Sequence, residues 1–69
     1  DYKTHLQEVL QGKGESNIWY RLVQEKGPDH NKRFVMQVGI NEEVLGVGEG
    51  KSKKEAEQVA ARIALNDIV

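Results

Sequence analysis

The strongest structural signal in the chain lies in residues 48–68, which read GEGKSKKEAEQVAARIALNDI. Ser52, followed three residues later by Glu55, forms a capping box, a pattern that marks the first turn of a helix. Apolar residues then recur at helical spacing to the end of the chain. They are Ala56, Val59, Ala60, Ile63, Ala64 and Ile68. The stretch predicts a C-terminal helix whose alanines allow a close approach to a neighbouring element.

The residues upstream of this helix alternate between apolar and polar types, which is the pattern of a β-strand. Three such runs are separated by short segments rich in turn-forming residues. The predicted strands are 18–26, 33–40 and 44–49, and the turns between them are 27–31 and 41–43. Because parallel strands need crossovers of a dozen or more residues, reversals this short predict an antiparallel sheet.

The chain opens with a second helical pattern. Asp1 can cap a helix, and Gly12 and Gly14 end it. The apolar residues between them at helical spacing are Tyr2, Leu6, Val9 and Leu10. The predicted order is therefore α-β-β-β-α. This is an α+β fold in which both helices cover one face of a three-stranded antiparallel sheet, since neither helix has another apolar partner.

Length and composition limit the possible functions. The 69 residues fit one small domain, 1–69, with 10 Lys and Arg, 11 Asp and Glu, a net charge of −1 and no cysteine. The lack of cysteine excludes disulfides, thiolate zinc sites and thiol nucleophiles. No apolar run or signal-peptide pattern predicts a membrane partner, so we expect a cytoplasmic protein. The chain begins at Asp1 rather than methionine, which we interpret as a piece of a longer protein.

The residues that could perform catalysis or bind metal do not converge. His5 and His30 lie in different predicted elements, and neither has a metal-ligating neighbour at helical or strand spacing. The run GVGEGKS (46–52) resembles a phosphate-binding loop, but it has three residues between Gly46 and Gly50 where that motif needs four. We therefore predict no catalytic residue, no metal site and no cofactor within this chain.

Three bases are concentrated at the start of the predicted C-terminal helix. Lys51, Lys53 and Lys54, which we name the lysine cluster, lie within four positions. A first helical turn normally favours Asp or Glu, by about 0.3–1 kcal/mol each, because the helix dipole is positive there. Glu55 and Glu57 relieve part of this conflict, and Lys53 is spaced to pair with Glu57. We interpret the cluster as a site for an external anion; a solvated group of lysines is the alternative.

The predicted N-terminal helix carries an unusual polar face opposite its apolar stripe. Its side chains offer hydroxyl, amide and carboxylate groups where a solvent face more often has lysine and glutamate. They are Thr4, Gln7, Glu8 and Gln11, which we name the helix strip. Such groups suit the shallow minor groove of A-form RNA, although an ordinary polar face explains them too. Only Trp19 is expected as an exposed aromatic ring, whereas a single-strand-binding sheet needs several.

The sequence resembles a known family of domains. Residues 48–57, with the alanine-rich continuation, resemble the C-terminal signature of the double-stranded RNA-binding domain. The α-β-β-β-α order, Tyr20, Phe34 and the loop 27–30 match as well, so the likeness covers the whole chain. The opening residues 3–8, KTHLQE, further resemble the version attached to bacterial ribonuclease III.

The resemblance implies a three-part surface for A-form double-stranded RNA. The helix strip would lie in one minor groove, the loop between the first two strands in the next, and the lysine cluster on the major-groove phosphates between them. The implied loop residues are Pro28, Asp29 and His30, and the implied companions of the lysine cluster are Ser52 and Gln58. The resemblance implies that the chain binds RNA without sequence preference and positions it for a ribonuclease III catalytic domain, which is absent here. That catalytic domain would depend on magnesium and would form a homodimer.

Two positions depart from the family pattern. Ile18 stands where the family often has proline, and Glu57 stands where many members have lysine, so that one phosphate-facing charge is missing. Together with the net charge of −1, the second departure leaves another interpretation open. The chain would then be a protein-interaction or dimerisation module of the same fold with little affinity for RNA.

Overall fold

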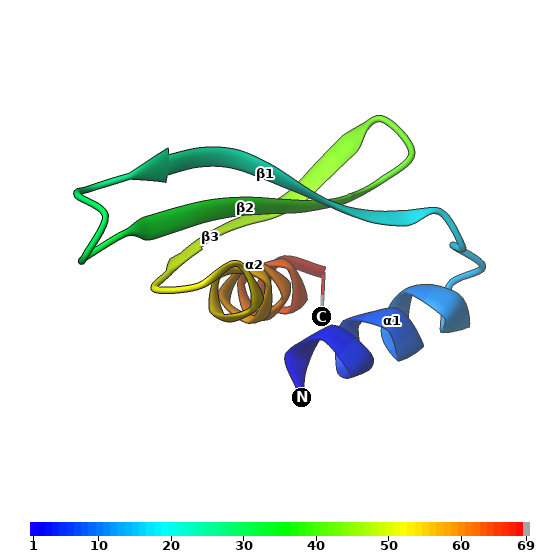
Figure 1. The fold of residues 1–69 in the computed structure, drawn as a ribbon. Coiled ribbons are helices and arrows are strands. Elements are labelled where there is room, and N and C mark those ends of the chain that lie inside the picture. The colour runs from blue at the N-terminus through cyan, green and yellow to red at the C-terminus, as the bar shows by residue number, and fades with distance from the viewer. Residues whose placement is uncertain (69) are drawn as a thin grey trace.

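The structure is a computed structural model that describes residues 1–68 (Figure 1). Its elements are α1 (Tyr2–Gly12), β1 (Ile18–Lys26), β2 (Arg33–Ile40), β3 (Glu43–Gly50) and α2 (Lys53–Ile68). The strands form one antiparallel sheet in the order β1-β2-β3, and Figure 1 shows both helices on the same face of it. The predicted α+β fold is confirmed, and β3 is one residue longer at each end than the sequence predicted.

Both ends of α1 follow from the local sequence. The carboxylate of Asp1 accepts a hydrogen bond from the N–H of Thr4 at 2.8 Å, which is the expected N-cap. After the last turn, Gly14 adopts a φ of +87°, a conformation that favours glycine. Of the apolar stripe, Leu6 and Leu10 are buried, but Tyr2 is 47% exposed. Tyr2 lies outside the core because the first turn of α1 meets α2 through polar groups.

The core is a layer of small residues between the sheet and α2. The fully buried alanines of α2 are Ala56, Ala60, Ala61 and Ala64. A Cβ added at Gly48 of β3 would lie 2.6 Å from the carbonyl oxygen of Ala56, so the backbones of β3 and α2 are in direct contact. Val38 of β2 and Leu6 and Leu10 of α1 fill the remaining interior. The alanines thus serve the close approach that their spacing predicted.

A bulge interrupts the alternating pattern of β1. The pairing with β2 passes from Leu22 opposite Met36 to Gln24 opposite Val35, so Val23 has no partner. Leu22 and Val23 are 38% and 50% exposed. Leu22 therefore shares the helix-facing side with Met36, but the helices leave this half of β1 uncovered.

Trp19 is half-buried, where the sequence predicted an exposed ring. It stands opposite Gly39 of β2, and a Cβ there would collide with the indole ring, so the missing side chain leaves room for the tryptophan. The indole N–H donates a hydrogen bond to the carbonyl of Asn41 at 2.8 Å. The ring is packed within its own sheet and does not form a free stacking platform.

Candidate nucleic-acid interface

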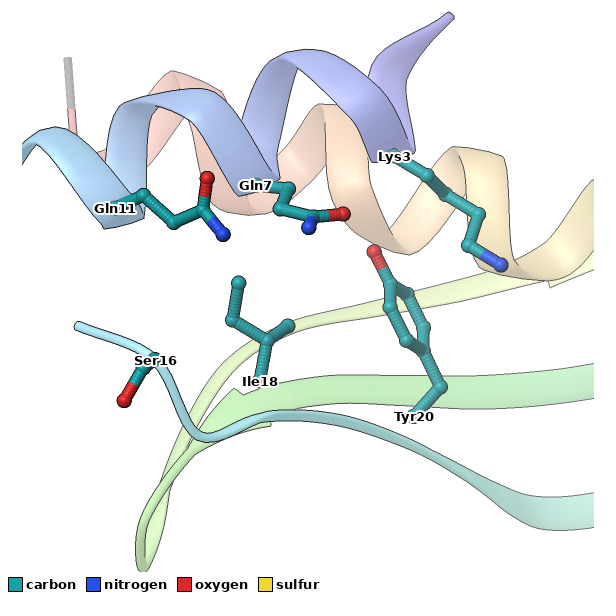
Figure 2. Close-up of a pocket in the computed structure, with 6 residues that line it drawn as sticks. All are labelled: Lys3, Gln7, Gln11, Ser16, Ile18 and Tyr20. Atoms are coloured by element: carbon teal, nitrogen blue, oxygen red, sulfur yellow. The ribbon is translucent and has the colours of Figure 1, made fainter.

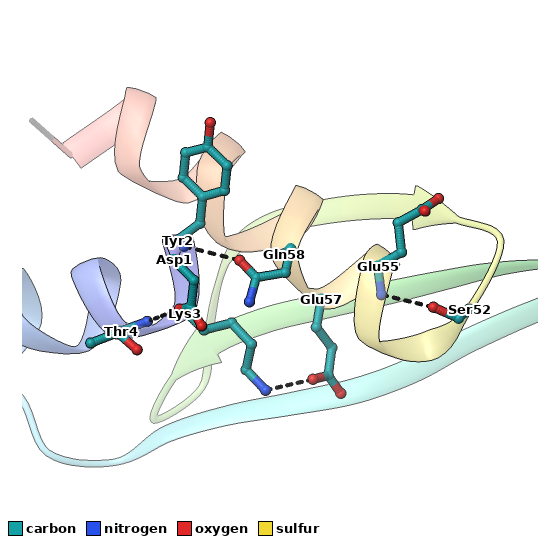
Figure 3. A network of polar contacts seen from close by, with 8 residues as sticks. All are labelled: Asp1, Tyr2, Lys3, Thr4, Ser52, Glu55, Glu57 and Gln58. Atoms are coloured by element: carbon teal, nitrogen blue, oxygen red, sulfur yellow. Dashed lines mark hydrogen bonds and ion pairs between the residues drawn. The ribbon is translucent and has the colours of Figure 1, made fainter.

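The start of α2 has the geometry that its capping box predicts. The N–H of Glu55 donates to the hydroxyl oxygen of Ser52 at 3.0 Å, and the carboxylate of Glu55 accepts from the N–H of Lys51 at 2.8 Å (Figure 3 shows the first contact). All three lysines of the cluster are exposed, and none forms an ion pair with a carboxylate of residues 1–68. Their charge therefore remains available to an outside anion, at a helix end that itself favours anions.

Basic residues in and next to the sheet, by contrast, form ion pairs with nearby carboxylates. Lys26 and Arg33 both contact the carboxylate of Glu49, at 3.0 and 3.2 Å, and Lys32 contacts that of Glu25. Hydrogen bonds from Lys26 and Arg33 lower the pKa of Glu49, and the hydrogen bond from Lys32 lowers the pKa of Glu25. The charge of Lys53 also contributes to the lowered pKa of Glu25. Among residues 1–68, however, no lysine of the cluster has an ion-pair partner, so the cluster is an exposed cationic site on a chain whose net charge is −1.

A tight turn shapes the loop between β1 and β2. Gly27 adopts a φ of +92°, and a Cβ there would lie 2.6 Å from the carbonyl oxygen of Asn31. The N–H of Asn31 donates to the carbonyl of Pro28 at 2.9 Å and closes the turn. Asp29 and His30 lie at its tip, and all three predicted contact residues are exposed. We name Pro28, Asp29 and His30 the hairpin loop.

The hairpin loop and the lysine cluster lie at the same end of the sheet. Phe34, near the start of β2, pairs with Gly50, the residue directly before the cluster. Figure 1 shows α1 beyond the start of α2, on the side away from the hairpin loop. The three predicted contact regions therefore follow one another along a molecule whose longest extent is 41 Å.

All four residues of the helix strip are exposed. Gln7 and Gln11 also line a surface hollow of about 320 Å³ between α1 and β1, together with Lys3, Ser16, Ile18 and Tyr20. Figure 2 shows the two amides extending from α1 over Ile18, while the Tyr20 ring rises from β1 toward the helix. The hollow thus presents hydrogen-bonding groups above an apolar floor.

Gln58 is the predicted contact residue that is half-buried. Its side-chain oxygen accepts a hydrogen bond from the N–H of Tyr2 at 2.9 Å, which links α1 to α2 (Figure 3). Gln58 therefore has a structural contact through its oxygen, and the amide nitrogen is the group left for a phosphate.

The sequence reasoning missed a contact made by Lys3. Its Nζ lies 2.6 Å from Oε1 of Glu57 (Figure 3) and 4.7 Å from the centroid of the Tyr20 ring. The expected pairing of Glu57 with Lys53 was wrong, because the packing of α1 against α2 brings Lys3 to the same carboxylate. No local spacing in the sequence connects positions 3 and 57.

Burial, together with the charge of Glu57, raises the pKa of Tyr20 to about 12 from its ordinary value of 10.0. The unfolded chain then loses the Tyr20 proton at lower pH than the folded chain does. The stability that Tyr20 contributes is complete below pH 10 and is lost as the pH rises toward 12. We expect the urea midpoint to fall over this range, and Tyr20→Phe to make the fall smaller. Tyr2→Phe is the matched control and should leave the fall unchanged. If the urea midpoint of Tyr20→Phe falls with pH as steeply as that of the wild type, other groups cause the fall.

Within residues 1–68, no three His, Asp or Glu side chains are grouped so that they could hold a metal ion. The same part of the chain has no helix with the length and hydropathy needed to cross a bilayer. The predicted contact residues do offer exposed ammonium groups, amides, hydroxyls, an imidazole and two carboxylates, spread over α1, the hairpin loop and the start of α2. This arrangement suits an extended polyanion with hydrogen-bonding edges better than a small enclosed ligand.

Comparison with known proteins defines the class. Residues 2–68 match the family described as the double-stranded RNA binding motif. The chain belongs to this family. It is 60% identical over 68 residues to Ribonuclease 3 of Caldanaerobacter subterraneus subsp. tengcongensis, covering 99% of this chain and 30% of that protein. It is 56% identical to Ribonuclease 3 of Bacillus cytotoxicus, covering 99% and 28%. The chain thus spans less than a third of these relatives.

Solved structures of other proteins have the same fold as this chain. Arabidopsis HYL1, from a structure described in relation to miRNA processing, has a TM-score of 0.80 and 30% identity, over 97% of this chain and 94% of that one. Dicer from Pichia stipitis has a TM-score of 0.77 and 29% identity, over 96% of this chain and 32% of that one.

Proposed function

We propose that this chain binds A-form double-stranded RNA without sequence preference, through the helix strip, the hairpin loop and the lysine cluster. The observation that carries the proposal is the lysine cluster, which is exposed and has no ion-pair partner within residues 1–68, while Lys26, Lys32 and Arg33 of the sheet are paired with carboxylates. Membership of the double-stranded RNA binding motif family supports the same ligand.

Each surface has a distinct role in this proposal. The ammonium groups of the lysine cluster, with the hydroxyl of Ser52 and the amide of Gln58, contact phosphates across the major groove. The hairpin loop enters one minor groove with backbone groups and the His30 imidazole. The helix strip enters the other, where its amides and hydroxyl bond 2′-hydroxyls, the groups that distinguish RNA from DNA.

The relatives extend the proposal to the protein from which the chain comes. Those named Ribonuclease 3 are more than three times as long as this chain. We infer that the chain holds and positions RNA for a ribonuclease III catalytic domain elsewhere in a longer cytoplasmic protein. Cleavage, a need for magnesium and homodimerisation belong to that catalytic domain in this proposal.

A protein-interaction module is the second candidate function. Val44 and Val47 of β3 are 44% and 43% exposed, and the open face of the sheet has no covering element among residues 1–68. Exposed apolar side chains of this kind favour association with another protein surface. This candidate predicts self-association and little affinity for RNA.

Titration distinguishes the two candidates. The chain is mixed with an RNA duplex of about two helical turns and, separately, with a DNA duplex of equal length, each at two salt concentrations. RNA binding that weakens with salt and exceeds DNA binding supports the proposed function. Sedimentation of the free chain tests self-association. No RNA binding at low salt, together with dimers, would establish the second candidate.

Gln7→Ala in the helix strip tests the minor-groove contact in the same assay. Because a neutral hydrogen bond contributes about 1 kcal/mol, we expect about fivefold weaker RNA binding. The salt dependence should be unchanged, because no charge is removed, and DNA binding should change less. His5→Ala, an exposed residue of the same helix outside the strip, is the control. Equal losses for RNA and DNA would contradict a role for Gln7 in reading 2′-hydroxyls.

A further inference from the structure

We propose that Glu57 is a positioning residue: through Lys3 it holds α1, and with it the helix strip, at a fixed distance from the lysine cluster. The inference rests on the proposed function, since it concerns how two parts of one RNA surface are held in register. On this view, the glutamate at position 57 does more than take the place of a phosphate-facing lysine. It is an acceptor that faces inward to α1.

The local geometry supports this role. Nζ of Lys3 lies 2.6 Å from Oε1 of Glu57, and the side chains of the pair are only 37% and 21% exposed. The same Nζ lies 4.7 Å from the centroid of the Tyr20 ring, so Lys3 contacts both α2 and β1. Figure 3 shows its side chain extending from the first turn of α1 toward Glu57. A charge-assisted contact in such a partly enclosed position is stronger and more directional than a pair in open water.

The pair also lies where it can control the spacing of the two RNA-contacting elements. Glu57 is one helical turn beyond Lys53 and Lys54, on the same rigid helix. Gln58, its neighbour, accepts the hydrogen bond from Tyr2 N–H. Both polar links therefore join the first turn of α1 to the turn of α2 that follows the lysine cluster.

The remaining contact of α1 does not fix its direction in the same way. Leu6 and Leu10 are buried with the alanines of α2 in one apolar cluster. Apolar burial is non-directional, so it holds α1 against α2 but permits small changes of angle. The polar links supply the directional restraint.

Without the link between Lys3 and Glu57, the affinity for RNA falls because the unbound protein becomes more variable in structure. If α1 samples several angles, only a fraction of the molecules present the helix strip and the lysine cluster at the spacing of successive RNA grooves. The apparent affinity falls in proportion to that fraction. The cost applies to a ligand that needs both surfaces together, such as a duplex spanning both grooves.

Simple charge counting predicts the opposite result. Glu57→Gln removes a negative charge close to the lysine cluster and frees the ammonium group of Lys3. On electrostatics alone, this variant should bind RNA more tightly and with a steeper salt dependence. The two explanations therefore differ in the sign of the effect.

The experiment measures binding of Glu57→Gln to the RNA and DNA duplexes at several salt concentrations. We expect about fivefold weaker RNA binding and a smaller preference for RNA over DNA. Asp67→Asn, at an exposed carboxylate of the same helix, makes the same charge change and should not weaken binding. The double variant Lys3→Glu with Glu57→Lys reverses the pair and should restore RNA binding to within about twofold of the wild type.

Lys3→Met provides a second route, since it keeps the aliphatic stem over Tyr20 and removes the charge. It should weaken RNA binding by a similar factor, and its effect should not add to that of Glu57→Gln. If wild-type chain fails to bind RNA, the proposed function is wrong. If wild-type chain binds but Glu57→Gln binds as tightly as Asp67→Asn or more so, the positioning role is wrong and the proposed function stands.

Discussion

Replacing Lys53 and Lys54 together with alanine is expected to weaken RNA binding about 30-fold at moderate salt. This factor corresponds to about 1 kcal/mol for each charge-assisted phosphate contact. Both side chains are exposed and unpaired in residues 1–68, so their removal exposes no buried partner and leaves the fold intact. The loss should be the same for all duplex sequences, because phosphates carry no sequence information.

The salt dependence gives the sharper measurement. In a plot of log affinity against log salt concentration, each phosphate contact contributes about 0.9 to the slope, so the double variant should lose about 2. Replacing Lys26 and Lys32 with alanine removes the same charge from lysines that are paired with Glu49 and Glu25. That control should keep most of the wild-type slope. A wild-type slope in the variant lacking Lys53 and Lys54 would mean that the lysine cluster does not contact phosphate.

The second large effect concerns stability. Gly48→Ala should destabilise the domain by about 3 kcal/mol, because the added Cβ lies 2.6 Å from the carbonyl oxygen of Ala56 and would also collide with the backbone nitrogen of Ala60. Helix backbone cannot move aside as a flexible side chain can, so α2 as a whole must shift. The free energy of unfolding of a 69-residue domain is only about 3–10 kcal/mol in total. Urea denaturation should therefore show a large loss or a domain that is already unfolded.

The same substitution at Gly12 is the matched control. Nothing lies within 4 Å of a Cβ added there, and Gly12 is the last residue of α1. Alanine favours the helix over glycine by up to about 1 kcal/mol, so Gly12→Ala should be neutral or stabilising. Equal destabilisation by both substitutions would show that the contact between β3 and α2 is looser than the structure indicates.

Most of the fold could be predicted because its signals are local. The capping box of Ser52 and Glu55, the Asp1 cap and the short turns each depend on neighbouring residues, and each appears where it was expected. The bulge at Val23 was not predicted, because residues 24–26, which follow it, are all polar and carry no alternation that would reveal the shift of register. The burial of Trp19 was missed because it depends on a glycine in the adjacent strand, Gly39.

The candidate site shows the same division between local and long-range information. Exposure of the helix strip and of the lysine cluster follows from helical periodicity, so the residues could be chosen from sequence. The pairing of Lys3 with Glu57 and the engagement of Gln58 by Tyr2 depend on how α1 crosses α2. That crossing combines the apolar packing of Leu6 and Leu10 with these polar links, and residue spacing shows neither.

The ion pairs of the sheet have a consequence for how a duplex first meets the protein. Glu49 follows Gly48, which contacts α2, so its side chain projects from the side of the sheet that the helices leave open. There it compensates Lys26 and Arg33. A polyanion that diffuses toward that side finds little net attraction, whereas one that approaches the start of α2 is drawn inward. Initial encounters are therefore biased toward one orientation, and several such domains could gather on a long duplex with their open sheet faces directed outward.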